Sequence, residues 1–346
     1  MEVNMGEVTI VDVAEKANVS PATVSRVLNK SAPVSSTKKE RVKRAIEKLN
    51  YKPNKFAHAL RKQRSDIVGI VVPDLSNPYF ANLIRGAEIY LHQIEKSALI
   101  CDTNSKPEQE GEYVNKLLEE RVDGVILVSS GEDSEQLELL LEKDIPVVAA
   151  DRDPHLNKVS KVLADNSEGG TQVASHLIQQ GYETYSFVKG PPGISTAESR
   201  YHGFLEELHS NGKRLKESFI FEGDYTYESG REIGRKLIED VEDKFIPLGI
   251  AASDDLMALG ILWELQNTGA KVPEEFGLTG FDDILMAKLM YPSLSTVKIP
   301  AYQIGKEAAK ILLENIERSS QGMNMITTKK IFDVELVPRK STNLKS

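Results

Sequence analysis

The sequence is poor in several features that define whole classes of protein. Its 346 residues include one cysteine, Cys101, which excludes a disulfide framework and any metal site built from several cysteines. No basic segment followed by an apolar run opens the chain, so no secretory signal is indicated. The longest apolar stretches, such as Val68–Val72, are strand-sized and far short of the ~20 residues that cross a bilayer. We therefore expect a cytoplasmic protein with no membrane partner, and the sequence indicates neither a metal nor a cofactor.

The sequence also lacks the short motifs of common catalytic sites. It contains no P-loop, no Gly-x-Gly-x-x-Gly after a strand, no Gly-x-Ser-x-Gly and no His-Glu-x-x-His. This absence favours a binding protein over an enzyme, and we predict no catalytic residue.

Acidic residues outnumber basic ones over most of the chain but not at its start. The net charge is −9, yet residues 1–64 hold 14 Lys and Arg against 6 Asp and Glu, a balance of +8. The remaining 282 residues hold 29 basic residues against 46 acidic ones. A polyanion is attracted to the first segment and repelled by the second, so the asymmetry predicts double-stranded DNA as a partner of residues 1–64.

Residues 9–29 predict two short helices joined by a tight turn. Thr9 is a predicted N-cap with Asp12 as its capping-box partner, and apolar side chains recur after it at i, i+3, i+4 and i+7. Ser20 caps the second helix, whose first position is Pro21, where a missing N–H costs nothing. A second helix with a small and polar outer face, placed after such a turn, describes a helix-turn-helix.

A third helix is expected after Ser35 or Ser36, and its apolar residues would close a miniature three-helix core. This arrangement puts the second helix in the DNA major groove, where Arg26 can donate to a guanine edge. We expect residues 1–51 to form the DNA-binding headpiece. Its predicted DNA contacts are Thr9, Ser20, Pro21, Ala22, Thr23, Ser25, Arg26 and Asn29.

The segment Val19–Asn29, Val-Ser-Pro-Ala-Thr-Val-Ser-Arg-Val-Leu-Asn, resembles the recognition segment of the lactose-repressor (LacI/GalR) family. The resemblance implies that residues 52–65 form a hinge helix and linker, in which a leucine opens a central base step in the DNA minor groove. By position that leucine is Leu60, with Ala57 and Arg61 beside it. A helix of about eight residues is too short to be stable alone in water, so it should fold only when paired with its dimer mate on DNA. A flexible basic linker is the alternative.

From residue 66 onward, short apolar strands alternate with amphipathic helices, which predicts parallel doubly wound sheets. The predicted strands are Val68–Val72, Leu99–Cys101, Gly124–Val128, Pro146–Ala149, Tyr185–Val188, Leu248–Ala251 and Leu278–Phe281. Nearly 280 residues suit two such sheets with a ligand cleft at their junction. The expected fold is thus an all-α helix-turn-helix headpiece followed by an α/β core of two doubly wound parallel-sheet subdomains.

We expect residues 66–342 to form an effector-binding and dimerisation core. Its N-subdomain is expected at about 66–163 plus 296–327, and its C-subdomain at about 164–294 plus 328–342. Only eight residues follow Pro338, too few for a tetramerising heptad helix, which favours a homodimer.

The resemblance to the lactose-repressor family, and through it to periplasmic sugar-binding proteins, continues through the core. The motifs that match in order are Asn77–Phe80, Arg121–Gly124, Asp165-Asn166 with Gly169-Gly170, Arg200–Phe204, Asp255–Gly260 and Gly280–Asp282. The family resemblance implies a transcriptional repressor whose affinity for operator DNA responds to a small effector, a sugar or sugar phosphate, bound between the subdomains. Carried over by position, the effector pocket is lined by Asn77, Tyr79, Phe80, Asp151, Arg152, Arg200, Asp254 and Asp282.

These residue types suit a polyol, because carboxylates and an arginine fork bind hydroxyls and aromatic rings cover the apolar faces of a sugar. Two positions depart from the family pattern: Ile299 stands where glutamine is usual, and Asp254 where sugar-sensing relatives often have asparagine. Asp165 and Asp255 are interpreted as mainly structural. Gly223–Gly230 resembles a stretch of catabolite control proteins, so a global regulator with a protein corepressor is the alternative function.

Overall fold

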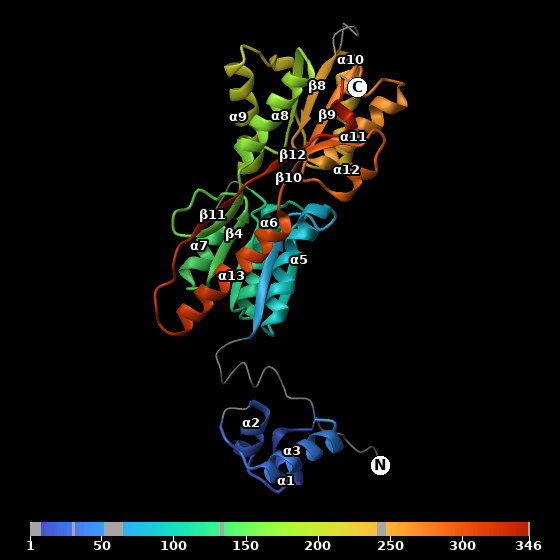
Figure 1. Ribbon diagram of the computed structural model, residues 1–346. Helices are drawn as coiled ribbons and strands as arrows, with labels where there is room; N and C mark the ends of the chain where they lie inside the picture. Colours follow the sequence, from blue (N-terminus) through green and yellow to red (C-terminus); the bar gives the residue numbers. More distant parts are fainter. Residues whose placement is uncertain (1–7, 30–31, 52–64, 132–134, 241–246, 345–346) are drawn as a thin grey trace. The chain divides into compact units, whose positions relative to one another are not determined.

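The computed structural model describes residues 8–29, 32–51, 65–131, 135–240 and 247–344. The chain divides into two compact units, Met1–Ser65 and Asp66–Ser346 (Figure 1). The predicted hinge residues Ala57, Leu60 and Arg61 lie outside the described residues.

The described part of the first unit folds as three helices, α1 (Ile10–Ala17), α2 (Pro21–Asn29) and α3 (Ser36–Leu49). The predicted capping box is present: the N–H of Thr9 donates to Asp12 at 2.7 Å, and the N–H of Asp12 donates to Thr9 Oγ1 at 3.4 Å. The pair satisfies N–H groups that have no partner within the helix. The buried residues of this small core are Val13, Ala14, Ala17, Val24, Val42 and Ala45.

Arg41 of α3 holds the turn between α1 and α2. Its Nε donates to the carbonyl of Ala17 at 2.9 Å, and a terminal nitrogen donates to the carbonyl of Asn18. Carbonyls at a helix C-terminus have no partner within the helix, so the guanidinium satisfies the end of α1 and fixes the position of α2 beyond it.

The first sheet of the second unit has, in the described residues, the strand order β11-β5-β4-β3-β1-β2, with all pairings parallel. Its strands are β1 (Ile67–Val72), β2 (Ser97–Asp102), β3 (Gly124–Leu127), β4 (Val147–Asp151), β5 (Ser160–Ala164) and β11 (Lys329–Phe332). Its helices are α5 (Pro78–Gln93), α6 (Pro107–Glu119), α7 (Glu135–Glu142) and α13 (Ala301–Ser320). This sheet and these helices are called the first lobe.

The second sheet has the order β12-β10-β9-β8-β6-β7 over the described residues, and only β12 runs antiparallel to its neighbour there. Its strands are β6 (Thr184–Lys189), β7 (Ile220–Glu222), β8 (Leu248–Ala252), β9 (Phe276–Phe281), β10 (Ser295–Lys298) and β12 (Glu335–Val337). Its helices are α8 (Asn166–Gln180), α9 (Ser195–Ser210), α10 (Tyr227–Asp240), α11 (Asp255–Asn267) and α12 (Leu285–Leu289). This half is called the second lobe.

The predicted boundaries between the subdomains need two corrections. The strand at Ser295–Lys298 belongs to the second sheet, where it pairs with β9, although residues 296–327 were expected in the first subdomain. The strand at Lys329–Phe332 belongs to the first sheet, where it pairs with β5, although residues 328–342 were expected in the second. Both strands pair with segments that are distant in the sequence. The amino acids of a short strand do not indicate which segment it pairs with, because strand formation depends on the tertiary neighbours.

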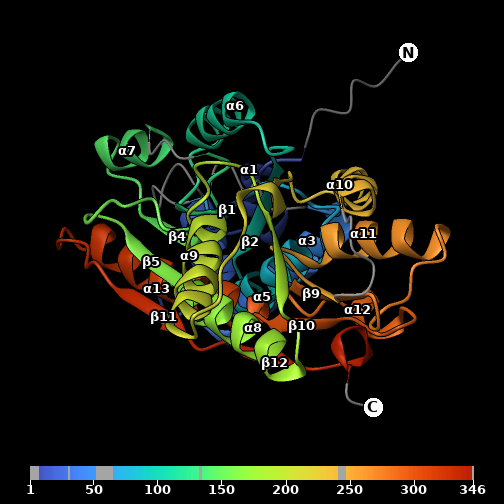
Figure 2. The ribbon, with the colours of Figure 1, turned by 90° about the horizontal axis from the view of Figure 1, so that it is seen from above.

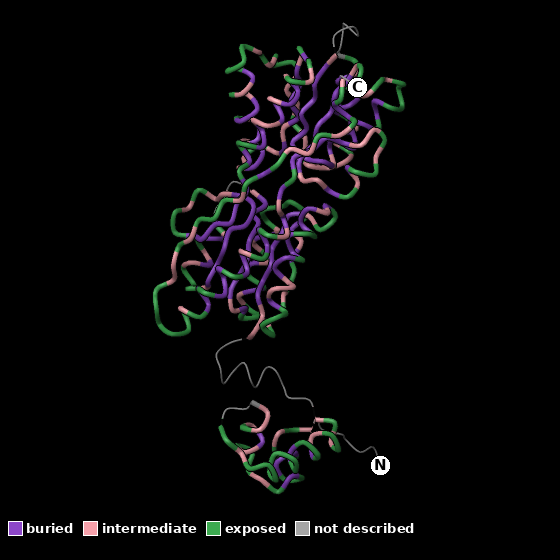
Figure 3. Tube along the Cα trace, viewed as in Figure 1, coloured by how far each residue is buried: buried purple, intermediate pink, exposed green. Residues whose placement is uncertain are grey.

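Helices cover both faces of each sheet (Figure 2). In β6 the neighbours Phe187 and Val188 belong to different buried clusters, because successive side chains of a strand point to opposite faces. The cluster of Phe187 includes residues of α8 and α9, and the cluster of Val188 includes residues of α10 and α11. Figure 3 shows the result, with buried strands inside each lobe and exposed segments around them.

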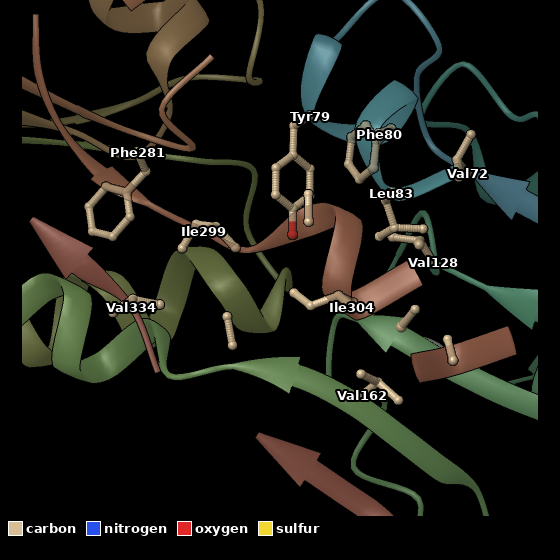
Figure 4. Close-up of a cluster of buried hydrophobic side chains, with 14 of the residues drawn as sticks. Val72, Tyr79, Phe80, Leu83, Val128, Val162, Phe281, Ile299, Ile304 and Val334 are labelled. Carbon is tan, nitrogen blue, oxygen red and sulfur yellow. The ribbon is translucent and has the colours of Figure 1, made fainter. Parts of the chain in front are cut away.

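One apolar cluster continues from the first lobe into the second (Figure 4). It contains Val72 and Leu83 of the first lobe together with Phe281 and Val334 of the second. Ile299, at the crossing from β10 to α13, is 4% exposed and belongs to the same cluster. The departure from the family's glutamine at this position therefore adds apolar contact at the junction of the lobes.

The packed helix pairs approach each other through glycines. A Cβ added at Gly170 of α8 would lie 2.1 Å from the carbonyl oxygen of Arg200, and one at Gly203 of α9 would lie 1.9 Å from that of Ser167. Each glycine thus receives the backbone of the opposite helix where no side chain fits. In the family-like motifs, Gly170 and Gly203 serve this contact between the helices, whereas a Cβ at Gly169 would lie 2.8 Å from the ring of Phe281.

Candidate functional site

A cavity opens between the two lobes, beside residues that follow β1, β4, β8 and β9. Its volume is about 290 Å³ with its open mouth included. Doubly wound sheets place ligands beyond the carboxyl ends of their strands, which is why residues distant in sequence meet here. The described residues that line the cavity are Asn77, Tyr79, Phe80, Asp151, Arg152, Thr196, Arg200, Tyr225, Asp254 and Asp282. All eight residues predicted for the effector pocket are among them.

On the first-lobe side, the cavity is lined by Asn77, the N-cap of α5, and by Tyr79 and Phe80 in the first turn of that helix. The Asn77 side chain accepts a hydrogen bond from the N–H of Tyr79 at 2.9 Å and so caps α5. The Tyr79 hydroxyl donates to Asp151, at the end of β4. Burial and the Asp151 carboxylate raise the pKa of Tyr79 well above its usual value, so the hydroxyl keeps its proton.

Arg152 is the cation of the first lobe. A terminal nitrogen donates to the carbonyl of Ser129, and the guanidinium lies 6.0 Å from the ring centre of Phe80. Burial lowers the pKa of Arg152, while the charge of Asp151 opposes this shift. Its Nε is buried and has no hydrogen-bond partner among the described residues. An unpaired buried donor is unfavourable by about 1–3 kcal/mol, so a ligand that accepts from Nε gains stabilisation there.

Arg200 is the cation of the second lobe, and α9 carries it. Its Nε donates to Asn166 at 2.7 Å, and a terminal nitrogen donates to the carbonyl of Ser253. The guanidinium lies 3.7 Å from the Asp282 carboxylate and 4.6 Å from the ring centre of Phe281. Burial raises the pKa of Asp282 well above its usual value, and the neighbouring Arg200 opposes that shift. The arginine is therefore held in place by its own lobe.

Asp254 stands at the N-terminus of α11. Its Oδ1 accepts a hydrogen bond from the N–H of Met257 at 2.9 Å and caps the helix. Its Oδ2 is buried and has no hydrogen-bond partner among the described residues. Burial raises the pKa of Asp254 to about 7, against the opposing hydrogen bond from Met257 and the charge of Arg200.

Thr196 and Tyr225 line the cavity and were not predicted from the sequence. Tyr225 follows β7, which spans three residues, and its φ of 68° is left-handed. A Cβ added at Gly190 would lie 2.2 Å from its ring, so the glycine makes room for the aromatic side chain. Such a short strand gives no periodic signal. The segment Gly223–Gly230, noted for its resemblance to catabolite control proteins, did contain this tyrosine.

Asp165 and Asp255 have structural contacts, as interpreted from the sequence. Asp165 caps α8 by accepting from the N–H of Glu168 at 3.0 Å. Asp255 accepts from the Thr296 hydroxyl at 2.6 Å and from the N–H of Ile284 at 2.9 Å. These bonds join α11 to β10 and to the loop before α12.

In the headpiece, some of the residues predicted to contact DNA have exposed side chains, and others form hydrogen bonds within the protein. Pro21, Ala22 and Arg26 are exposed on α2. Ser20 Oγ accepts from the N–H of Thr23 at 3.2 Å, which caps α2, and the Thr9 hydroxyl donates to Asp12. Ser25 is half-buried and has an interaction partner, and the side chain of Asn29 lies outside the described part of the structure.

Two family models match the chain. One, described as periplasmic binding proteins and sugar binding domain of LacI family, matches residues 65–334. The other, described as bacterial regulatory proteins, lacI family, matches residues 9–54. The chain belongs to the LacI family. Its fold is that of the lac repressor: a structure of the lac repressor dimer bound to operator and the anti-inducer ONPF matches with a TM-score of 0.85 at 26% identity, over 97% of this chain and 99% of that one.

Several curated repressors are similar over nearly the whole chain. The ribose operon repressor of Halalkalibacterium halodurans is 34% identical over 90% of this chain and 91% of that protein. The repressor PurR of Aliivibrio salmonicida is 33% identical, over 97% of this chain and 99% of that protein. Catabolite control protein A of Priestia megaterium is 32% identical, over 92% of this chain and 96% of that protein.

Repressors of the LacI family bind operator DNA and small-molecule effectors and act as dimers. This LacI-family chain is accordingly a DNA-binding transcriptional repressor with an effector-binding core, and it is not an enzyme. Across the described residues, no helix combines the length and the apolar character needed to span a membrane.

Proposed function

We propose that the protein is a cytoplasmic homodimeric repressor whose affinity for operator DNA is set by a small carbohydrate bound between its lobes. The main support for this proposal is the cavity, where carboxyl groups, two arginines and aromatic rings from both lobes lie close together. Hydroxyl groups bind to carboxylates and guanidinium groups, and aromatic rings cover apolar sugar faces. We assign residues 1–51 to DNA binding, 52–65 to the hinge and 66–342 to effector binding and dimerisation.

The DNA-binding assignment is supported by the exposed face of α2 and by the balance of +8 in residues 1–64. In this proposal Arg26 donates to a guanine edge, and the headpiece contacts of the first helix and turn position α2 in the groove. Leu60, flanked by Ala57 and Arg61, enters the minor groove from the hinge helix and opens a base step there.

Control by an effector is supported by the fact that both lobes contribute charged groups to the cavity. Asp151 is the last residue of β4 in the first lobe, whereas Arg200 and Asp282 belong to the second. A ligand that contacts both sides at once binds the closed cleft better than an open one. It shifts the balance of the two states by that difference in affinity alone. In the proposed dimer, closure changes the spacing of the paired hinges.

Two relatives suggest the first probes. One is a ribose operon repressor, and the other is a solved regulator in complex with cellobiose, which is 29% identical over 96% of this chain. The similarity to catabolite control protein A supports a second candidate, a global regulator that uses a protein corepressor.

The test is a band-shift titration of the full chain on a DNA site selected from a random-sequence library. Ribose, glucose, cellobiose and a phosphocarrier protein are added separately at saturating concentration. A sugar that changes operator affinity supports the proposal, and calorimetry must then show that it binds the isolated protein. A response to the phosphocarrier protein alone would favour the second candidate. A chain that selects no DNA site would contradict the proposal.

A further inference from the structure

A short turn after β4 holds Asp153 in the first lobe. Asp153 lies two residues beyond Asp151, the last residue of β4. Its carboxylate accepts hydrogen bonds from Nζ of Lys161 on β5 at 2.5 Å and from the N–H of His155 at 2.9 Å. Nζ of Lys329 on β11 lies 3.7 Å from the same carboxylate. Two neighbouring strands and the turn itself therefore fix the main chain at Asp153.

The partner of this main chain belongs to the other lobe. Ser195 is the first residue of α9, and its Oγ accepts a hydrogen bond from the N–H of Asp153 at 2.8 Å. The bond lies beside the cavity, because Arg152 precedes Asp153 in the chain and Thr196 follows Ser195, and both of these neighbours line the cavity. Asp153 and Ser195 themselves are not among the described residues that line it.

This hydrogen bond depends on how close the two lobes are. Asp153 is fixed to β5 and β11, and Ser195 begins a helix that packs closely against α8. A donor and an acceptor 2.8 Å apart no longer form a hydrogen bond at about 3.6 Å, so a separation of less than about 1 Å at this point breaks the contact. Because neither group lines the cavity, an effector is not needed to form the bond.

We propose that the hydrogen bond from the main chain of Asp153 to Ser195 is a latch, which stabilises the closed cleft independently of the effector. This inference rests on the proposed function, since it concerns the closure that the effector is proposed to control. The latch and an effector favour the same state of the cleft. The loss of the latch should therefore change operator affinity in the direction opposite to the effect of the effector.

The size of the effect follows from the kind of bond. The N–H of Asp153 and the hydroxyl of Ser195 are both uncharged groups, and in an open cleft water can take the place of either partner. The net effect of such a bond on an equilibrium is roughly 2- to 12-fold. The ratio of closed to open molecules should fall by this factor when the acceptor is removed.

Three variants of α9 test the latch without changing a residue that lines the cavity. Ser195→Ala removes the acceptor, and Ser195→Thr keeps a hydroxyl at the same position and should restore the wild-type behaviour. Ser210→Ala is the matched control at the last residue of the same helix. The hydroxyl of Ser210 donates to the carbonyl of Glu207 at 2.9 Å, within its own helix, and is exposed.

The first experiment measures the distance between the lobes in the full chain by fluorescence energy transfer between single molecules' dyes. Dyes are attached to cysteines that replace Glu112 on α6 and Glu228 on α10, two exposed residues on opposite lobes. Both helices lie on the side of the core away from β10, β11 and β12 (Figure 2). Cys101 is buried and stays in place. An excess of unlabelled chain leaves at most one labelled subunit in each dimer.

Without sugar, the ratio of closed to open molecules should be roughly 2- to 12-fold lower in Ser195→Ala than in the wild type. Ser195→Thr and Ser210→Ala should give the wild-type ratio. Identical distributions of the distance in Ser195→Ala and the wild type would overturn the inference, as would a loss of closed molecules in Ser210→Ala as large as that in Ser195→Ala.

The second experiment measures operator affinity by band-shift with and without saturating ribose, glucose or cellobiose. Ser195→Ala without sugar should differ from the wild type by at most about 12-fold, in the direction opposite to the change that an active sugar causes in the wild type. A change in the same direction contradicts the latch and leaves the proposed function intact. If none of the sugars alters operator affinity, the proposed function fails, and the distances between the lobes still decide whether the latch exists.

Discussion

The guanidinium of Arg200 lies 3.7 Å from the carboxylate of Asp282, and both groups are almost fully buried in the second lobe. Asn166 and the carbonyl of Ser253 accept hydrogen bonds from the same guanidinium, so three polar groups of one lobe fix its orientation, and the ring centre of Phe281 lies 4.6 Å from it. A side chain held in this way loses little further freedom when a ligand binds, which favours tight and selective contact.

Arg200→Ala should abolish the response to effector. In the wild type we expect effector to change operator affinity roughly 5–150-fold, the range of ordinary allosteric coupling. The variant should keep its ligand-free operator binding but have a lower free energy of unfolding, because Asn166 and the carbonyl of Ser253 lose their buried hydrogen-bond donor. Operator affinity with and without saturating effector, together with chemical denaturation, measures both effects.

Arg231→Ala is the control for that variant. Arg231 shares its partner Glu264 with Arg235, and it does not line the cavity. This variant should respond to effector as the wild type does. If Arg200→Ala also responded in full, Arg200 would not be part of the effector site.

Arg26→Ala should weaken specific operator binding by ~1–3 kcal/mol and relax discrimination at one base pair in each half-site. Arg26 is exposed on α2, where the guanidinium is free to reach a base edge. Quantitative band-shifts on matched and singly mismatched operators measure both effects. Lys39→Ala, which removes an exposed cation from α3, should act equally on all sequences if it acts at all. An equal loss on every sequence for Arg26→Ala would mean that it contacts only phosphate.

The stability of the ligand-free protein should fall as the pH rises through neutrality. The pKa of Asp254 is about 7 in the folded chain, against a reference value of 3.8. Between these values the folded chain holds a proton that the unfolded chain has released, so the contribution is present at low pH and is lost as the pH rises through 7. At 1.36 kcal/mol per pKa unit, the loss is roughly 4 kcal/mol at most.

Asp254→Asn removes this titration. The free energy of unfolding of the variant, measured by denaturant titration at about pH 5 and pH 8, should fall less between the two values than that of the wild type. Asp165→Asn, which changes an exposed cap, should behave as the wild type does. Identical pH profiles for the wild type and Asp254→Asn would show that Asp254 does not titrate in this range.

Gly170→Ala should destabilise the core by about 1–3 kcal/mol, because the new methyl group would meet the carbonyl oxygen of Arg200 at 2.1 Å. Gly111→Ala in α6 is the matched control. A Cβ there would lie 3.2 Å from the movable end of Gln136, and alanine is favoured over glycine in a helix by about 1 kcal/mol. Thermal unfolding should therefore show a lower Tm for Gly170→Ala and an equal or higher one for Gly111→Ala. Equal stability of Gly170→Ala and the wild type would contradict the contact.

The parts of the fold that follow from local chemistry could be predicted from the sequence. The capping box of Thr9 and Asp12 needs only residues three apart, and the strand of Val68–Val72 is signalled by its own apolar run. The strands at Ser160–Ala164 and Lys329–Phe332 were missed. They pair with each other across a long stretch of chain, and their buried or paired state depends on that partner.

In the candidate site, too, some residues could be predicted from the sequence and others could not. Asp151, Asp254 and Asp282 could be predicted because each closely follows a strand, and parallel sheets bring strand ends together. Tyr225 could not, since it follows a strand of three residues and turns through a left-handed conformation. Its ring occupies space that a side chain at Gly190 would fill. Because Gly190 is distant in the sequence, the residues around Tyr225 do not indicate this contact.

The glycine contact between α8 and α9 has a consequence for how the site moves. The main chain at Arg200 rests on Gly170, and its side chain is held by Asn166, the first residue of the same helix. Both ends of Arg200 therefore take their position from α8, which begins directly after the chain leaves β5 of the first lobe. If the cleft opens or closes, we expect α8, α9 and the guanidinium to move together, because these contacts join them. The distance from Arg200 to Asp151 would then change while the contacts of Arg200 within its own lobe are kept.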